Sequence, residues 1–329
     1  MTALIKAAKA EGHLNVITLP SNWANYGNIM KDFTAKYGIK INDANPEGSS
    51  QDEVNAMEQE KGQSRAPDVL DMGTAFAIEA DQKGLLSPYQ VATWANIPSS
   101  SKASDSTWYA DYGGYVAIGY DASKVKIPPT SFKSLLNPAY KHEVAINNNP
   151  TEAQAAFAAV WAAALANGGS FTNIQPGITF FKKLDQEGNF VPVAAGPTTV
   201  ENGSTPIVIW WDYLLASEVQ SSVKTFKVVI PSDASFAAYY DQAISKSAPD
   251  PAAARLWEEY LYSVAGQNLW LEGEARPIEL PTLISDGTVN KAALAALPAA
   301  PAGTPTFPTQ QEATTAQGVV TQQWPSVVG

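Results

Sequence analysis

Aromatic residues and carboxylates gather where several predicted β-strands end. Aromatic faces attract ammonium groups by ~0.5–2 kcal/mol each, and a carboxylate accepts their N–H donors directly. In open α/β sheets, ligands bind beyond the carboxyl ends of strands, so these positions are candidate ligand contacts. The candidates are Trp23, Tyr26, Thr74, Phe76, Tyr112, Thr151, Trp211, Asp212, Tyr239 and Asp241. The charged residues at these ends are acidic, which predicts a site for an amine.

Several of these residues also have a purely structural interpretation. Trp210 and Trp211 alternate in one predicted strand, so one of the two is expected to face the core. Asp212 is equally suited to cap a following helix. A zwitterion with one carboxylate would also need donors, and backbone N–H groups at helix starts near Thr74 or Thr151 supply them.

The elements that must position these residues alternate between strand and helix. Strand patterns at 13–19, 39–42 and 67–72 alternate with helical patterns from 29, at 51–61 and at 74–83, which favours parallel βαβ units. The same order returns with strands at 115–120, 142–146, 190–193 and 206–211 and a long apolar helix from Thr151. A final helix is predicted over 249–271, with a weak point near Ala265-Gly266. The tail from 297 has the composition of a linker, but Phe307 and Trp324 indicate that it packs onto the body.

Length and composition exclude several classes of protein. The 329 residues are enough for about two domains. The formal net charge is -11, from 21 Lys+Arg against 32 Asp+Glu, so the basic footprint of a nucleic-acid binder is missing. There is no Cys, no apolar run of ~20 residues and no signal-peptide pattern at Met1. These features fit a small-molecule binder.

Motifs for catalysis or cofactor binding are missing from the sequence. It has no G-x-x-x-x-G-K-[ST], no H-E-x-x-H and no G-x-S-x-G. We therefore expect no enzyme activity, no cofactor and no metal. The alternative from another class is a hydrolase with an aromatic cleft, which turnover of a bound ligand would reveal.

Five segments, in order, carry a resemblance to one family across most of the chain. They are residues 7–12 (AAKAEG), 66–69 (APDV), 84–89 (GLLSPY), 128–138 (PPTSFKSLLNP) and 243–257 (AISKSAPDPAAARLW). They resemble the type II extracellular solute-binding proteins of ABC importers that handle ferric ion, thiamine, polyamines and small amino compounds. One departure is Asp250, where relatives often carry His.

The resemblance implies an α/β fold of two lobes joined by crossing strands, with the ligand in the cleft between them. Residues 1–112 plus 236–329 would form lobe 1 and 113–235 lobe 2, with hinge crossovers near 112–118 and 226–238. Closure on the ligand would precede delivery to a membrane permease. The resemblance also implies a monomer that is periplasmic or extracellular, lipid-anchored or free, with its leader absent from this chain.

Within the family, the chain is similar to the polyamine-binding branch. The matching positions are Trp23 with Tyr26, then Trp211, then Tyr239-Tyr240-Asp241. The expected ligand is a small cationic or zwitterionic amine, polyamine or 4-aminobutyrate-like. Thiamine suits the same residues, and Tyr239-Tyr240 leaves ferric ion as an alternative. An anionic ligand would need a basic group, for which Arg276 is the plausible candidate.

Overall fold

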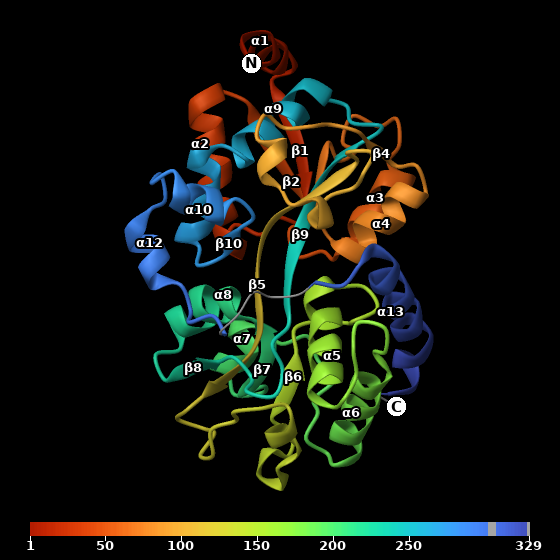
Figure 1. Ribbon diagram of the computed structural model, residues 1–329, viewed down its shortest axis with the longest axis vertical. Helices are drawn as coiled ribbons and strands as arrows, with labels where there is room; N and C mark the ends of the chain where they lie inside the picture. Colours follow the sequence, from red (N-terminus) through yellow and green to blue (C-terminus); the bar gives the residue numbers. More distant parts are fainter. Residues whose placement is uncertain (302–306, 328–329) are drawn as a thin grey trace. The chain divides into compact units, whose positions relative to one another are not determined.

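The computed structural model describes residues 1–301 and 307–327 and divides the chain into two compact units (Figure 1). Unit 1 comprises Met1–Gly113 and Tyr239–Leu297, and unit 2 comprises Gly114–Ala238 and Pro298–Gly329. Two strands, β5 (Trp108–Asp121) and β9 (Ala237–Ser245), begin in one unit and end in the other. The fold is therefore a two-unit α/β fold whose chain crosses between units more than once.

Unit 1 combines short strands with helices that pack around them. Its strands are β1 (His13–Ile17), β2 (Lys40–Ala44), β3 (Val69–Gly73), β4 (Leu86–Ser87) and β10 (Arg276–Pro277). Its helices are α1 (Thr2–Glu11), α2 (Tyr26–Tyr37), α3 (Ser50–Gln59), α4 (Thr74–Gln82), α9 (Pro251–Leu261), α10 (Val264–Glu272), α11 (Leu280–Ser285) and α12 (Lys291–Ala296). Strands β1 and β2 are parallel, whereas β3 and β4 run antiparallel to β9 and β10 antiparallel to β5.

Local sequence explains where several unit 1 helices begin and end. Helix α2 ends at Gly38, whose φ of 72° is in the left-handed region that glycine adopts without strain. A capping box between Ser49 and Asp52 starts α3. The single helix predicted over 249–271 is wrong, because Ser263 caps a new helix, α10, by accepting from the N–H of Gly266.

Unit 2 is built on a mixed sheet covered by alanine-rich and aromatic helices. Its strands, besides part of β5, are β6 (Val144–Ile146), β7 (Ile207–Trp211) and β8 (Phe226–Val229). Its helices are α5 (Gln154–Ala166), α6 (Gln175–Gln186), α7 (Pro197–Glu201), α8 (Asp212–Leu214) and α13 (Gln310–Gln323). Strand β7 pairs antiparallel with β5 and parallel with β6, so β6 and β7 end at the same edge. The strand predicted at 190–193 is reduced to one bridge, between Phe190 and Val144.

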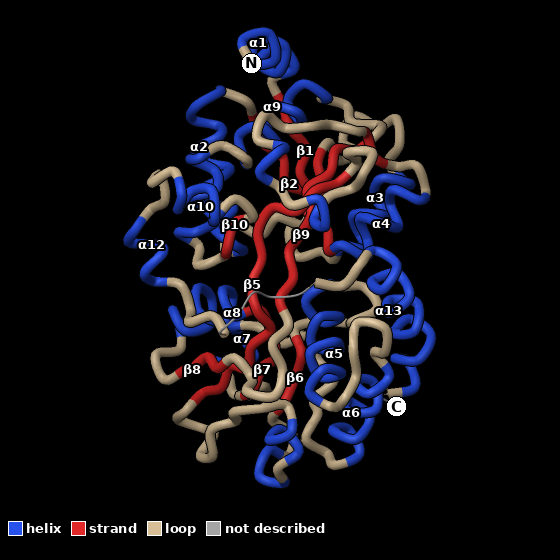
Figure 2. The backbone as a smooth tube through the Cα atoms, in the orientation of Figure 1, coloured by secondary structure: helices blue, strands red, loops and turns tan. Residues whose placement is uncertain are grey.

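The C-terminal segment packs in unit 2, whereas the sequence assigned all of 236–329 to lobe 1. Helix α13 packs against α6, beside α5 (Figure 2). The Trp324 ring lies 5.4 Å from the Phe181 ring and 6.4 Å from the Phe190 ring. The predicted packing of this tail through Trp324 is thus observed, but the lobe that receives it was wrong. The reason is that the aromatic partners of Trp324 belong to α6 and the segment after it.

No helix in the described part of the chain is long and apolar enough to span a membrane.

Candidate functional site

Three aromatic side chains of unit 1 form one contiguous surface, which we call the aromatic platform: Trp23, Tyr112 and Tyr240. The Tyr112 and Tyr240 rings stack with centroids 5.7 Å apart and an interplanar angle of 9°. Trp23 meets Tyr240 edge-on at 5.8 Å, and its Nε1 donates a 2.7 Å hydrogen bond to the Tyr112 hydroxyl. Trp23 is partly exposed, whereas the two tyrosines are buried. Trp23 can therefore present aromatic surface to a ligand, and the two buried tyrosines hold it in place.

The backbone around Trp23 is held in an unusual conformation. Trp23 begins a short 3₁₀ turn in which Ala24 has φ 44° and Asn25 has φ 68°. Positive φ is costly for alanine, so the surroundings must impose it. The Asn25 side chain donates a 2.6 Å hydrogen bond to the Leu269 carbonyl, and Gly273 gives room for Asn25, because a Cβ there would lie 2.7 Å from the Asn25 Cβ. Helix α10 thus fixes the turn that carries Trp23.

Beneath the platform lies a hydrogen-bonded chain of buried polar groups. The Tyr112 hydroxyl donates to Asp71 Oδ2 at 2.8 Å, and the Tyr26 hydroxyl donates to the same oxygen at 2.9 Å. Gln242 Nε2 donates both to the Tyr26 hydroxyl, at 3.0 Å, and to Asp111 Oδ2, at 2.8 Å. The other oxygen of Asp111 accepts the backbone N–H of Tyr112. Two buried carboxyl groups are therefore connected to the platform through Tyr112.

Burial dominates the titration of these carboxyl groups. It raises the pKa of Asp71 to about 7, although hydrogen bonds from Tyr112 and Tyr26 partly oppose it. Burial, and then the charge of Asp71, raise the pKa of Asp111 well above its usual range. Burial and the same two carboxylates raise the pKa of the Tyr26 phenol, so this hydroxyl stays protonated and donates. The base of the platform carries negative charge that depends on pH near neutrality.

Most of the other predicted residues of unit 1 are buried. Tyr26 is fully buried, stacked on Trp257 with centroids 6.5 Å apart, so it supports the platform from within the core. Phe76 is also buried, in α4. Asp241 pairs in register with Met72, is 1% exposed, and has its pKa raised by burial and lowered by a hydrogen bond from Thr74. Tyr239 is partly exposed.

In unit 2, the predicted pair Trp211 and Asp212 marks the end of β7. The Trp211 and Tyr213 rings stack with centroids 6.4 Å apart. Asp212 is fully buried, and its Oδ1 accepts the backbone N–H of Tyr115 at 2.9 Å. A Cβ at Gly114 would lie 2.3 Å from that Oδ1, so only glycine fits. The carboxylate of Asp212 therefore ties β7 to β5.

Thr151, the remaining predicted residue, lines a pocket of about 410 Å³ in unit 2. Its hydroxyl donates to Asn149 Oδ1 at 2.9 Å, and its carbonyl accepts from Gln317 of α13. The pocket lies where β6 ends and is lined on its other side by Phe190 and Trp324. Its polar groups are neutral amides and a hydroxyl, so it suits an uncharged group better than an ion.

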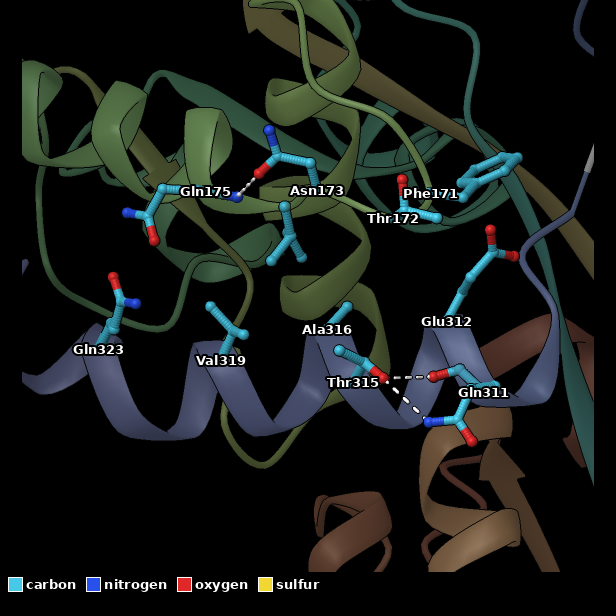
Figure 3. Close-up of a pocket in the computed structure, with 11 residues that line it drawn as sticks. Phe171, Thr172, Asn173, Gln175, Gln311, Glu312, Thr315, Ala316, Val319 and Gln323 are labelled. Carbon is cyan, nitrogen blue, oxygen red and sulfur yellow. Dashed lines mark hydrogen bonds between the residues drawn. The ribbon is translucent and has the colours of Figure 1, made fainter.

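A second unit 2 pocket, of about 350 Å³, separates α13 from residues 171–175 (Figure 3). Figure 3 shows Glu312 on α13 pointing toward Phe171 and Thr172, whereas the Thr315 hydroxyl donates back to the Gln311 carbonyl. The Glu312 carboxylate accepts from the backbone N–H and the hydroxyl of Thr309 in a capping box. These hydrogen bonds of the Glu312 carboxylate stabilise the first turn of α13.

Sequence reasoning missed Asp71, Asp111 and Gln242. A signal was present for the first, because Asp71 interrupts the apolar run of a strand whose five residues are all buried. Burying a carboxylate without hydrogen-bond donors costs free energy, so Asp71 must have such donors nearby. The two tyrosines that donate to Asp71, Tyr26 and Tyr112, lie 45 and 41 positions away from it in the sequence, so spacing alone does not connect them. In the described residues, no group of three or more His, Cys, Asp or Glu side chains is placed to hold a metal ion.

Comparison with known proteins assigns the class. The family model of bacterial extracellular solute-binding proteins matches residues 64–302, which is more than half of the chain. The fold is similar to that of the periplasmic binding protein AfuA from Actinobacillus pleuropneumoniae with exogenous fructose-6-phosphate bound (TM-score 0.78, 18% identity, 96% of this chain and 98% of that chain). It is also similar to a periplasmic thiamin binding protein (TM-score 0.75, 18% identity, 96% of each chain) and to iron-bound HitA from Pseudomonas aeruginosa (TM-score 0.69, 18% identity, 96% and 99%).

These matches define a solute-binding protein of the two-lobed periplasmic class, as the resemblance predicted. The chain belongs to the bacterial extracellular solute-binding protein family. It is the solute-binding component of an ABC importer, with a periplasmic or extracellular location and a permease as its partner. The similar structures hold a sugar phosphate or iron, or are named for thiamin. Membership of the class therefore does not identify the solute that this protein binds.

Proposed function

We propose that this protein captures a small cationic or zwitterionic amine, such as a polyamine or 4-aminobutyrate, and delivers it to its permease. The observation that carries the proposal is the aromatic platform, with its stacked tyrosines and Trp23 above buried carboxyl groups. Ring faces attract an ammonium group, and negative charge below them adds to that attraction. A phosphate or carboxylate ligand would meet the opposite field.

The proposed contacts of unit 1 are Trp23 and Tyr240, with Tyr112 as the ring between them. Tyr239 remains a proposed contact as the sequence predicted it. Tyr26, Phe76, Trp211, Asp212 and Asp241 are assigned a supporting role instead, because each is buried with its own packing or hydrogen-bonding partners. Thr74, the first residue of α4, stays a candidate for orienting a carboxylate at a helix start, whereas Thr151 lies ahead of α5 in a pocket that suits an uncharged part of the ligand. We further propose that binding closes the two units and that the protein has no catalytic activity.

Ferric ion is a weaker proposal for this site. Tyr239 and Tyr240 are neighbours on β9, and adjacent side chains of a strand point to opposite faces of the sheet. The Tyr240 ring is also stacked on Tyr112. Thiamine, which combines a positive charge with flat rings, fits the platform and is therefore included in the test.

The test is a thermal-shift screen of putrescine, spermidine, 4-aminobutyrate, glycine betaine, thiamine, fructose-6-phosphate and ferric citrate. A ligand at ~100 times its Kd adds about 2.7 kcal/mol to the free energy of unfolding. We expect a shift with at least one amine and none with fructose-6-phosphate. A shift with the sugar phosphate alone would overturn the proposal, and turnover of any bound compound would replace it with an enzyme.

A matched pair of tryptophan variants then locates the site. Trp23→Ala removes one ring of the platform and should lower the affinity for the amine by about tenfold, because a cation–π contact is worth ~0.5–2 kcal/mol. Trp94→Ala is the control: Trp94 is also a partly exposed unit 1 tryptophan in a 3₁₀ turn, but its ring holds Lys102 and meets Tyr109. Calorimetry should give an unchanged affinity for the control. Equal losses in both variants would contradict the assignment.

A further inference from the structure

The carboxyl groups of Asp71 and Asp111 are both buried in unit 1 and are linked through Tyr26 and Gln242, which hydrogen-bond to each other and donate to Asp71 Oδ2 and Asp111 Oδ2, respectively. Both oxygens of Asp111 already accept from other groups, the backbone N–H of Tyr112 and Gln242. Asp71 Oδ2 accepts from two tyrosine hydroxyls, and Asp71 Oδ1 has no hydrogen-bond donor among the described residues. Two neighbouring buried carboxylates repel each other, so the pair keeps one proton, and Asp71 Oδ1 is the oxygen that can hold it without displacing a donor.

The hydroxyl hydrogens show what a second proton would do. The Tyr112 oxygen accepts from Trp23 Nε1, and its hydrogen is given to Asp71 Oδ2. The Tyr26 oxygen accepts from Gln242, and its hydrogen is given to the same Oδ2. If Asp71 Oδ2 took up a proton, that hydrogen and the hydroxyl hydrogens of Tyr26 and Tyr112 would all crowd around one oxygen. At least one tyrosine hydroxyl would then have to turn away. The chain from Trp23 to Asp71 is complete only while Oδ2 is unprotonated.

We propose that Asp71 is the positioning residue of the aromatic platform, and that the Asp71–Asp111 pair orders Tyr112 and Trp23 when it holds one proton and releases them when it takes up a second. The part of this proposal that concerns ligand binding rests on the proposed function, whereas the proton-dependent ordering of Trp23 does not.

The groups around the pair reinforce its dependence on protons. The carboxyl groups that face it oppose negative charge on the pair, whereas the Tyr26 phenol donates to Asp71 and stabilises that charge. The described titratable groups that interact with the pair come from α2, α3, β9, α9 and the segment after α9: Tyr26, Glu53, Asp241, Glu258 and Tyr262. Burial likewise raises the pKa of Asp71 to about 7, which brings the uptake of the second proton to neutral pH.

Ligand affinity should follow the charge of the pair. Loss of the second proton adds one negative charge beneath the platform and restores the Trp23–Tyr112 hydrogen bond, so a cation binds more tightly as pH rises through about 7. By linkage, binding a cation slightly below that pH must expel a proton from the pair to the solvent. We expect a change in affinity of about tenfold, within the usual range for coupled sites.

The first experiment follows the indole N–H of Trp23 by NMR between pH 5.5 and 8.5, assigned by its loss in Trp23→Phe, with no ligand added. The resonance should shift with a midpoint near neutrality. Asp71→Asn should abolish this shift, because the amide oxygen still accepts from both tyrosines and the amide N–H replaces the proton held on Oδ1. Tyr112→Phe should abolish it as well, by removing the hydroxyl that connects Trp23 to Asp71.

A matched control separates this effect from a general one. Asp68 is also a buried aspartate of unit 1 whose pKa is raised to about 7, but it accepts from the backbone N–H groups of Asn15 and Asp250. Asp68→Asn should leave the Trp23 shift in place. A parent resonance that does not respond to pH, or one that responds equally in Asp71→Asn, would overturn the proposal. If Asp71→Asn does not fold, Tyr112→Phe decides the question.

The second experiment measures putrescine affinity and proton release by calorimetry in two buffers at pH 6.5 and 8.0. The parent should bind about tenfold more tightly at pH 8.0 and release a proton at pH 6.5, whereas Asp71→Asn should lose most of the pH dependence. If putrescine does not bind but the Trp23 resonance titrates, the assigned ligand has failed and the positioning role of Asp71 stands. If putrescine binds independently of pH while the resonance titrates, the link to affinity is overturned.

Discussion

Both units carry aromatic residues on or just after their strands, but what lies behind those residues differs. In unit 1, Tyr112 rests on Asp71 and through it on Asp111, and both carboxyl groups are buried. In unit 2, the one carboxylate at the end of β7, Asp212, is committed to the backbone of Tyr115. Behind it stands α5, a helix buried at nearly every position and built mostly of alanine. Buried carboxyl groups thus lie beneath the aromatic residues of unit 1, whereas a close-packed, apolar helix lies behind those of unit 2.

This difference separates two requirements of a binding protein. A unit with buried, titratable carboxyl groups can recognise the charge of a cation, because low dielectric surroundings strengthen its field. A unit with an apolar, close-packed base offers a rigid surface whose contribution is contact area. We infer that the charge specificity of this protein resides in unit 1, and the predictions below test how independent the two units are.

The largest expected effect is in the packing of unit 2. Trp324→Ala removes a ring that packs on Phe181 and Phe190 and is 6% exposed. Loss of a buried tryptophan costs about 3–5 kcal/mol. Native-state hydrogen exchange should show amides of α5 and α6 losing protection, while amides of β3 in unit 1 keep theirs.

The control for this variant is Trp94→Ala, which removes a partly exposed tryptophan of unit 1. It should lower protection in unit 1 and leave α6 unchanged. If Trp324→Ala loosened both units equally, the assignment of the C-terminal segment to unit 2 would fail, and with it the separation of the two units.

The next effect concerns the buried charge of unit 1. The pKa of Asp71 is about 7 in the folded protein and near 3.8 when exposed. The unfolded chain therefore loses its proton first, and the free energy of unfolding falls as pH rises from about 4 to about 7. Asp71→Asn should remove a part of this fall on the order of 3 kcal/mol, measured by urea unfolding at pH 4.5 and 7.5.

The sign of this dependence is a sharp test, since a salt-bridged aspartate would give the reverse. Stability that increased between pH 4.5 and 7.5, with Asp71→Asn abolishing the increase, would show that Asp71 is stabilised as a carboxylate. Our interpretation instead makes the charged pair a cost to folding that is kept at a functional site. Unit 2 variants such as Trp324→Ala should leave the pH dependence unchanged.

The sequence predicted most of the fold because its signals are local. Alternating strands and helices, the end of α2 at Gly38 and the apolar helix now seen as α5 all follow from periodicity and capping. The family match agrees with the resemblance that five short segments carried. The weak point predicted near Ala265-Gly266 lies close to Ser263, where a side-chain cap starts α10 and divides the predicted helix in two.

The site was less predictable, because its determinants are distant in sequence. Trp23 was chosen by its place after a predicted strand and Tyr112 by its place at the predicted first crossover, and the structure joins them by a hydrogen bond. Tyr26 was chosen on the same grounds but is directed into the core. Nothing in strand spacing indicates whether a tyrosine at a strand end points outward or donates to a buried carboxylate such as Asp71. That distinction depends on packing across residues more than 40 positions apart.

The smallest expected effect comes from charges of unit 1 that water reaches. Lys83 lies 3.0 Å from Glu79 and 3.3 Å from Glu58, and all three side chains are more than a third exposed. Exposed ion pairs of this kind contribute about 0.3 kcal/mol, because solvent screens them and ordering long side chains opposes them. Lys83→Gln should therefore change the urea unfolding free energy by less than about 0.5 kcal/mol, and the change should vanish in 1 M salt. The comparison with Asp71→Asn is direct, since both variants alter one charge in the same unit. If Lys83→Gln cost as much as the aspartate variant, burial would not be what makes the charges beneath the platform effective, and the contrast between the two units would lose its physical basis.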